Sequence, residues 1–321
     1  MLSSKMIIEH KNNINIGKII GKMGMPIAFI AIFIAFSVLN ENFLTPSNIQ
    51  NIIVQSAIIG IVAVGQTLVI LTGGIDLSVG SIVAFIGIIC GIFLNNNLGI
   101  PYAVILSLLI GALFGLFNGV VTSYGKVPSF IVTLGTMSII RGAALFINNG
   151  KPVSGFSEGF QKLANTNVFA SIPIFVIYLF IIYGVIYFIL NYLPIGRYIY
   201  AVGGNKSCAW LSGISVKKVE TLTYVLSGLF AAFAGIMLLS RMNYGTPTAA
   251  SDYNTDSIAA VIIGGCAMSG GRGSVIGTFL GAIMMAMLKN GLTLLNVSTY
   301  LQQIITGVVI ILAVFIDKRQ K

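Results

Sequence analysis

Few residues of this sequence could do chemistry, and most of those few are polar side chains within long apolar segments. The candidates for contact with a solute, or for a gate, are Gln66, Asp76, Ser78, Asn118, Asn290, Gln302 and Gln303. An amide both donates and accepts hydrogen bonds, which a hydroxyl-rich solute requires. The same amides can instead bond a neighbouring helix, and for any single amide this second role is the more common one.

The only charged candidate, Asp76, lies in the glycine-rich stretch L71-T-G-G-I-D-L-S-V-G-S81. The glycines of this stretch allow the backbone to turn sharply. Asp76 or Ser78 can then cap a helix that begins near Leu77. A charge at membrane depth is costly unless it faces protein or water. We predict that Asp76 mainly builds a capped turn between two helices; a gating charge and direct solute contact are the alternatives.

The sequence shows no nucleophile–base pair and no His-containing metal motif of the kind that an enzyme centre requires. Cys90, Cys208 and Cys266 each lie in or beside an apolar run and are typical of packing residues. The single histidine, His10, cannot build a metal site alone. The sequence contains no G-x-x-x-x-G-K-[ST] motif and therefore no P-loop. We expect a non-enzymatic chain that binds no metal or cofactor, so any ATP hydrolysis must come from another subunit.

The composition indicates a membrane protein. Of 321 residues, 56% are hydrophobic and 8% are charged, and the mean hydropathy is +0.97, whereas a soluble domain carries about 25% charged residues. Apolar runs long enough to cross a bilayer lie near 23–39, 52–71, 78–94, 100–121, 128–147, 172–193, 219–239, 273–289 and 299–316, with a shorter run at 257–268. We predict an all-α transmembrane bundle of about ten spans over 23–316, with tails at 1–22 and 317–321.

The basic residues are distributed unevenly between the two sides of these spans. With the N-terminus inside, thirteen Lys and Arg residues fall in cytoplasmic segments, and only Lys151, Lys162 and Arg241 fall in outer loops. Such a bias is expected of cytoplasmic loops, so we predict that both termini are cytoplasmic. The net charge of +10 then reflects contact with anionic membrane lipid, and we expect no nucleic-acid partner.

The sequence contains a weak internal repeat. The stretch 71–81 resembles M268-S-G-G-R-G-S-V-I-G-T278, and F117-N-G-V120 resembles K289-N-G-L292. Duplicated halves are common among transporters. The two pairs disagree on sidedness, because the span count places Asn118 inside and Asn290 outside. We therefore expect one segment, most plausibly 257–268, to be re-entrant or broken.

Taken in order along the chain, the motifs resemble one family over nearly the whole length. The matching motifs are A63-V-G-Q-T-L-V-I-L-T-G-G-I-D-L-S-V-G-S81, R141-G, N149-G-K-P-V153, G196-R-Y-I-Y-A-V-G-G-N205, L211-S-G-I-S-V216, I258-A-A-V-I-I-G-G265 and N290-G-L-T-L-L-N-V-S298. The sequence resembles the permease subunit of bacterial ABC importers for monosaccharides, in the ribose-type branch. Two departures are visible: Asn254 stands where the family usually has a glutamate, and Cys208-Ala209 replaces a pair of alanines.

The resemblance implies a function and a set of partners. The expected function is ATP-driven import of ribose or a similar pentose across the bacterial inner membrane. The expected partners are a second permease chain, an ATPase that carries ATP and Mg, and an extracytoplasmic sugar-binding protein. A permease for nucleosides or another sugar-like solute is the alternative. An ion-coupled transporter is a further alternative, although the spans hold no series of acidic or histidine residues.

The connection 194–218 is the expected contact with the ATPase. Within it, N205-K-S-C-A-W-L-S212 favours a short helix with an Asn cap, and Gly213 suits its end. The resemblance places the coupling helix of the family here, and the residues assigned to coupling are Gly203, Asn205, Ala209, Trp210, Ser212 and Gly213. Trp210 is the only tryptophan and a natural interface anchor; the alternative is a tryptophan that rests among lipid headgroups.

Overall fold

The structure is a computed structural model that describes residues 16–168 and 172–319. It confirms the predicted all-α class, since helices make up most of these residues. The helices are α1 (Ile16–Leu39), η1 (Glu41–Leu44), α2 (Pro46–Leu71), α3 (Val79–Asn95), α4 (Ile100–Ser123), α5 (Ser129–Ile147), α6 (Glu158–Asn165), α7 (Ile174–Tyr192), α8 (Pro194–Gly204), α9 (Lys206–Leu211), α10 (Val216–Met242), α11 (Tyr253–Ile263), α12 (Val275–Leu294) and α13 (Thr299–Arg319).

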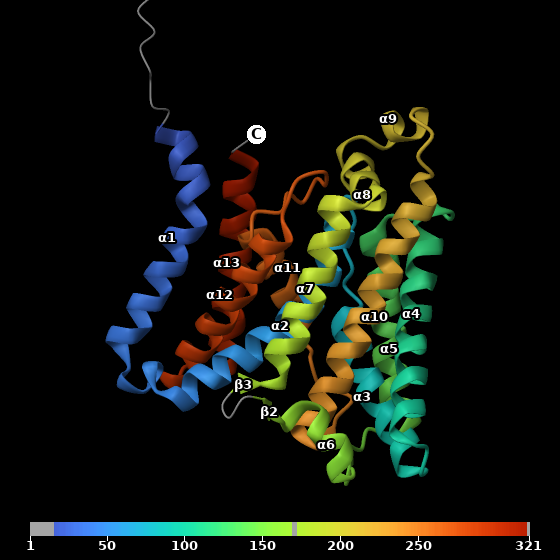
Figure 1. Cartoon of the computed structure of the whole chain (residues 1–321), viewed down its shortest axis with the longest axis vertical. Coiled ribbons are helices and arrows are strands. Elements are labelled where there is room, and N and C mark those ends of the chain that lie inside the picture. The colour runs from blue at the N-terminus through green and yellow to red at the C-terminus, as the bar shows by residue number, and fades with distance from the viewer. Residues whose placement is uncertain (1–15, 169–171, 320–321) are drawn as a thin grey trace, which may run out of the picture.

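The long helices run side by side between two ends of the molecule (Figure 1). The C-terminus, the start of α1 and the helices α8 and α9 lie at one end, which we call the α9 end. Helix α6 and the short strands β2 (Asn167–Val168) and β3 (Ile172–Pro173) lie at the opposite end, the α6 end. This arrangement places the two longest connections, 148–171 and 194–218, at opposite ends of the bundle.

Each predicted apolar run overlaps a helix, but the lengths of the helices differ. Among the described residues, six helices are long and apolar enough to span a membrane, namely α2, α4, α5, α7, α10 and α12. Shorter apolar helices cover Met25–Leu39, Val79–Asn95 and Thr299–Phe315. The count of ten spans therefore stays a prediction. Helix α1 begins at Ile16, inside the segment predicted as a tail, and residues 1–15 lie outside the described residues.

Helix α2 forms the centre of the bundle. Its most apolar window is 89% buried, and it packs against α7, α10, α11 and α12. A helix that is apolar on all sides is stable only when other elements surround it. In contrast, α4, α5 and α7 bury only 28% of their windows and leave large apolar side chains exposed. Such faces suit contact with lipid.

Helices α4 and α10 approach each other most closely where both carry glycine. A Cβ added at Gly115 would collide with the Tyr224 carbonyl, and one added at Gly228 would collide with the Gly111 carbonyl. Small residues let two membrane helices approach backbone to backbone. The small-residue run G228-L-F-A-A-F-A-G235 begins at this contact.

Two short antiparallel strand pairs connect segments of the chain at the α6 end. Strand β1 (Val153–Ser154) pairs with β4 (Tyr244–Gly245), with Val153 opposite Gly245, and β2 pairs with β3. Arg141 of α5 donates to the carbonyls of Pro247 and Ala249 at 2.5 and 3.0 Å. This intramembrane arginine therefore pairs internally with the loop that follows β4.

The expected break lies in the second glycine-rich segment. Helix α11 has 11 residues and is about 16 Å long, too short for a ~30 Å hydrocarbon core. It begins four residues before the predicted run 257–268 and ends earlier, and the chain then stays irregular until Ser274 caps α12. Gly271 N donates to Leu71 O at 2.9 Å, so the broken segment ends beside the first glycine motif.

Candidate functional site

The predicted turn at Asp76 is present, but α3 begins at Val79 rather than near Leu77, and its N-cap residue, Ser78, makes no side-chain capping bond. Asp76 Oδ1 accepts from Ser78 N at 3.0 Å and from Ser78 Oγ at 2.6 Å, just before α3 begins. Its other oxygen, Oδ2, accepts from Ser227 Oγ of α10 at 2.9 Å. Both carboxylate oxygens therefore have hydroxyl or amide donors, which compensates their removal from water.

Two more predicted residues join this turn. Asn118 Nδ2 of α4 donates to Ser78 Oγ at 2.9 Å. The Gln66 amide, oriented to satisfy both partners, donates to Asp76 O at 3.1 Å and accepts from Asp76 N at 3.2 Å. We call Gln66, Asp76, Ser78, Asn118 and Ser227 the Asp76 cluster. Each of them is at most 1% exposed, which favours the architectural interpretation over direct solute contact.

Asn290 lies elsewhere, paired with another amide. Asn48 Nδ2 donates to Asn290 Oδ1 at 2.9 Å, and Asn290 Nδ2 donates to Asn48 Oδ1 at 2.8 Å. Asn48 also donates to Phe43 O of η1. This reciprocal pair joins α2 to α12. Asn290 thus bonds a neighbouring helix, which was the alternative to contact with a solute. Asn290 and Asn118 therefore have different surroundings, so the second pair of the internal repeat does not mark equivalent positions.

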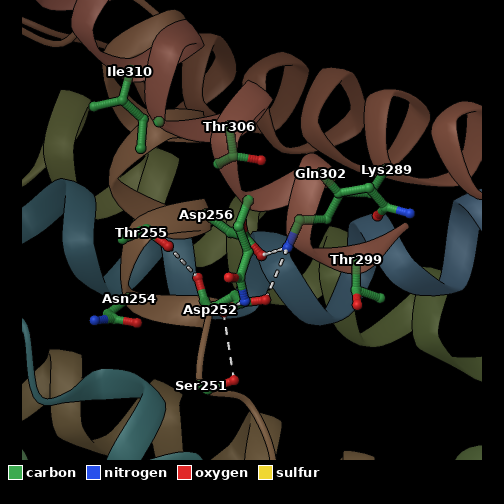
Figure 2. A pocket seen from close by; sticks show the side chains of 12 residues that line it. Ser251, Asp252, Asn254, Thr255, Asp256, Lys289, Thr299, Gln302, Thr306 and Ile310 are labelled. Atoms are coloured by element: carbon green, nitrogen blue, oxygen red, sulfur yellow. Dashed lines mark hydrogen bonds and ion pairs between the residues drawn. The ribbon is translucent and has the colours of Figure 1, made fainter. Parts of the chain in front are cut away.

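Gln302 and Gln303 of α13 line a cavity of about 320 Å³ between α11, α12 and α13, which we call the α11–α13 cavity. Lys289 Nζ reaches between two carboxylates there, at 2.5 Å from Asp256 Oδ2 and 3.9 Å from Asp252 Oδ2 (Figure 2). Gln303 Nε2 donates to Asp252 Oδ1 at 3.3 Å. Two of the seven predicted residues thus face one polar cavity.

The sequence interpretation missed Lys289 and Asp256. Lys289 is a single cation within the otherwise apolar α12, and Asp256 lies in the first turn of α11. A charged residue inside a membrane segment is by default a candidate functional residue, and this signal could have identified Lys289. Its partner is 33 residues away in sequence, and no spacing pattern links the two.

The short helix expected in the connection 194–218 is α9, and its two ends are as predicted. Asn205 Oδ1 accepts from Cys208 N at 2.9 Å and caps the first turn. At the other end Gly213, with φ +82°, donates from its N–H to Trp210 O, and Ile214 N donates to Ala209 O. These two bonds with a left-handed glycine form a Schellman motif. Helix α8 precedes α9 and was not predicted.

The assigned coupling residues differ in accessibility. Trp210 and Leu211 are 69% and 76% exposed, whereas Ala209 is 4% exposed. The exposed pair and Gly213 border a groove of about 1130 Å³ with the segment 122–128. Lys206 Nζ lies 2.6 Å from Glu220 Oε1 and ties α9 to α10. Trp210 and Leu211 are therefore available to a partner, and Ala209 instead holds α9 to the bundle.

Gly203 lies where three backbones meet. A Cβ added there would collide with Leu71 O and would lie 2.5 Å from Gly271 N. Only glycine fits at such a close approach. The end of α8, the end of α2 and the second glycine motif meet here without an intervening side chain, and we call this contact the glycine junction. It connects α8, the helix that precedes α9, to the central helix.

The described residues contain no group of three or more His, Cys, Asp and Glu side chains placed to hold a metal ion.

Gly204, Asn205 and Ser212 are exposed at the α9 end. The described part of the bundle thus contains a buried polar turn, a polar cavity and an exposed short helix.

Comparison with known proteins identifies the family. A model described as branched-chain amino acid transport system / permease component matches residues 48–314. The ribose import permease protein of Haemophilus influenzae is 40% identical over 315 residues, covering 97% of this chain and 98% of that protein. The ribose import permease protein of Bacillus subtilis is 38% identical over 321 residues, covering 99% of each.

A further relative is named for the transport of a different sugar. The D-allose transport system permease protein of Escherichia coli is 36% identical over 291 residues, covering 90% of this chain and 88% of that protein. No solved structure matches the chain significantly. The family match over most of the chain, with relatives this similar from end to end, shows that the chain belongs to this family of transport-system permeases, in its ribose-type branch.

Proposed function

We propose that this chain is the membrane-spanning subunit of an ATP-driven importer that moves a monosaccharide, with ribose as the first candidate. The observation that carries the proposal is the end-to-end similarity to permeases named for ribose import. The D-allose relative makes a hexose the second candidate. A chain without a P-loop requires its ATP and Mg to bind on a partner ATPase.

The ATPase contact is the exposed face of α9. Trp210 supplies a large aromatic surface of the kind that dominates interface energetics, and the groove beside it accommodates a partner side chain. Asn205, Ser212 and Gly213 shape the helix, and Gly203 passes its movement to α2 through the glycine junction. Within this scheme 194–218 is the coupling segment of the transmembrane domain 23–316.

The other partners follow from the family resemblance. The chain works as one of two permease subunits, most simply as a homodimer, in the bacterial inner membrane. An extracytoplasmic binding protein delivers the sugar at the α6 end. Both termini and α9 lie on the cytoplasmic side, which is supported by the distribution of basic residues.

The test is transport by the reconstituted importer. Proteoliposomes contain this chain and the ATPase, with the binding protein outside, and uptake of labelled D-ribose, L-arabinose and D-allose is measured with and without ATP. We expect uptake of ribose that depends on ATP, the ATPase and the binding protein. Uptake driven by an ion gradient without ATP would show a secondary transporter instead.

A further inference from the structure

The α11–α13 cavity contains polar atoms that nothing in the protein satisfies. Asp256 Oδ1 and Thr306 Oγ1 have no hydrogen-bond partner among the described residues. Both residues line the cavity. Asp256 is 0% exposed and Thr306 is 5% exposed. Buried polar atoms are normally paired, and an unpaired one costs about 1–3 kcal/mol, so the cavity is built to receive hydrogen bonds.

The position of the cavity excludes lipid as its occupant. Lys289 lies fifteen residues into α12, next to Asn290, whose partner Asn48 belongs to the first turn of α2 beside η1. This places the cavity in the half of the bundle toward the α6 end. Charged and polar groups at membrane depth must face water or protein. The cavity is therefore a hydrated recess on the side where a solute would enter.

The lining selects the chemical class of the solute. Asp256 Oδ1, as a carboxylate oxygen, can only accept, so the ligand must bring donors, whereas the Thr306 hydroxyl serves as either. Asp252 and Asp256 bring two carboxylates to the lining and Lys289 brings one ammonium group, so the lining has no excess positive charge that could bind an anion. Gly307 and Ile310 complete the lining with an apolar surface. A neutral polyol ring presents hydroxyls to the polar atoms and its C–H face to this surface.

The volume agrees with this class. A cavity of about 320 Å³ is the smallest size usual for small-molecule sites and corresponds to about ten water molecules. Hydroxyl groups reproduce the hydrogen bonds of the water that they displace, so entry of a sugar costs little desolvation. We propose that the α11–α13 cavity is a transient binding subsite for a neutral monosaccharide, in which Asp256 and Thr306 bond its hydroxyls. This inference rests on the proposed sugar-import function.

The first test separates this subsite from the function as a whole. In the reconstituted importer with D-ribose, Thr306→Val removes the hydroxyl but keeps the shape, and Thr306→Ser keeps the hydroxyl. We expect Thr306→Val to lower the ribose imported per ATP hydrolysed by about 3- to 10-fold, the loss of one hydrogen bond. Thr306→Ser should stay near the unmodified importer, and ATP hydrolysis stimulated by the binding protein should persist in both variants.

A matched control is Thr136→Val, because Thr136 is equally buried in α5 but does not line the cavity. Its Oγ1 bonds only its own helix, at Val132 O, so transport should be unchanged. If the unmodified importer takes up ribose and Thr306→Val retains the same ribose-to-ATP ratio, the subsite is refuted while the import function stands. An importer that hydrolyses ATP but moves no sugar would refute both.

A second test does not depend on the transport rate. Thr306→Cys is made in an importer in which Cys90, Cys208 and Cys266 are replaced, and a small water-soluble methanethiosulfonate reagent is applied from the outside. We expect labelling that tens of millimolar D-ribose slows severalfold. Thr248→Cys, an exposed loop position outside the cavity lining, should label at the same rate with and without ribose. Equal protection at both positions, or a Thr306→Cys disulfide between two permease chains, would contradict the subsite.

Discussion

Ser227 of α10 donates a hydrogen bond of 2.9 Å to Asp76, which follows α2, and thereby joins two segments that are 151 residues apart in sequence. With Ser78 on the other carboxylate oxygen, the aspartate connects the end of α2 and the start of α3 to the middle of α10. The charge is held by hydroxyl and amide groups rather than by a counter-ion. The carboxylate therefore acts first as the acceptor of several hydrogen bonds. A substitution that keeps an acceptor but removes the charge can test whether the charge itself matters.

We expect Asp76→Asn to keep the fold. The amide oxygen can still accept from Ser78, and the Ser227 hydroxyl can rotate to accept from the new NH₂. Asp76→Leu should lose several kcal/mol, since three donors become unpaired in the interior. Thermal unfolding in detergent measures both. If Asp76→Asn folds normally but abolishes uptake, the charge has a gating role and the architectural interpretation is wrong.

Gly74→Val should damage assembly. A Cβ at position 74 would collide with the Tyr224 hydroxyl and would lie 3.1 Å from Val69 Cγ1, and both neighbours belong to packed helices. Combining Gly74→Ala with Tyr224→Phe should restore part of the loss, because removal of the hydroxyl makes room for one methyl group. The amount of monodisperse protein recovered after detergent extraction gives the comparison. Equal recovery of Gly74→Val and the unmodified chain would contradict the close contact.

Trp210→Ala should weaken ATPase binding by about 2 kcal/mol or more if the side chain is the anchor of the contact. Trp210→Phe keeps an aromatic surface and should lose less. Gly213→Pro should disrupt the end of α9, because proline cannot adopt φ +82° and has no N–H to donate to Trp210 O. Each variant is assayed for ATP hydrolysis and uptake together. Unaltered coupling in Trp210→Ala and Gly213→Pro would leave Trp210 as a headgroup anchor.

Cys208 provides a test of orientation without any introduced residue. It is exposed on α9, whereas Cys90 and Cys266 are buried. We expect a membrane-impermeant maleimide to label Cys208 in inverted vesicles but not in intact cells, and Cys208→Ala to abolish the signal. Added ATPase should protect the thiol. Labelling of intact cells would place the α9 end outside.

Lys289→Met should destabilise the chain by about 3–5 kcal/mol, because Asp256 would keep a buried charge without its cation. The double variant Lys289→Met with Asp256→Asn should recover much of this loss, since both charges are gone. Unfolding temperatures of the two single variants and the double variant give the coupling free energy. Additive effects would mean that the 2.5 Å contact contributes nothing to stability.

The sequence predicted most helices because a membrane span needs a long apolar run, and that signal is local. It misplaced α11, whose first turn, Y253-N-T-D256, is polar and therefore invisible to hydropathy. It also missed α8, an amphipathic helix that itself contains Pro194 and three glycines. The ends of α9 were predicted correctly because caps depend on residue types at fixed offsets.

Tertiary contacts divide the candidate site residues predicted from the sequence into separate groups. Gln66, Asp76, Ser78 and Asn118 form one buried cluster, although Asn118 is 40 residues from Ser78. The α11–α13 cavity could not be predicted, because Lys289 and Asp256 become neighbours only when α11 packs on α12. Sequence spacing determines what lies on one helix face, and it does not determine which faces meet.

The glycine junction has a mechanical consequence. A contact made through side chains can absorb a displacement, because a side chain can change its rotamer. A contact between two backbones contains no group that can move in this way. The backbones of Leu71 and Gly271 lie so close to Gly203 that a Cβ at this position would collide with them, so a displacement of α8 and of α9 behind it would reach the central helix and the broken segment before α12. The same broken segment begins at α11, which carries Asp256. The backbone contact at Gly203 thus links α8, which leads into the exposed helix α9, through the broken segment to α11 beside the α11–α13 cavity, and a single added methyl group at residue 203 would change the length of that linkage.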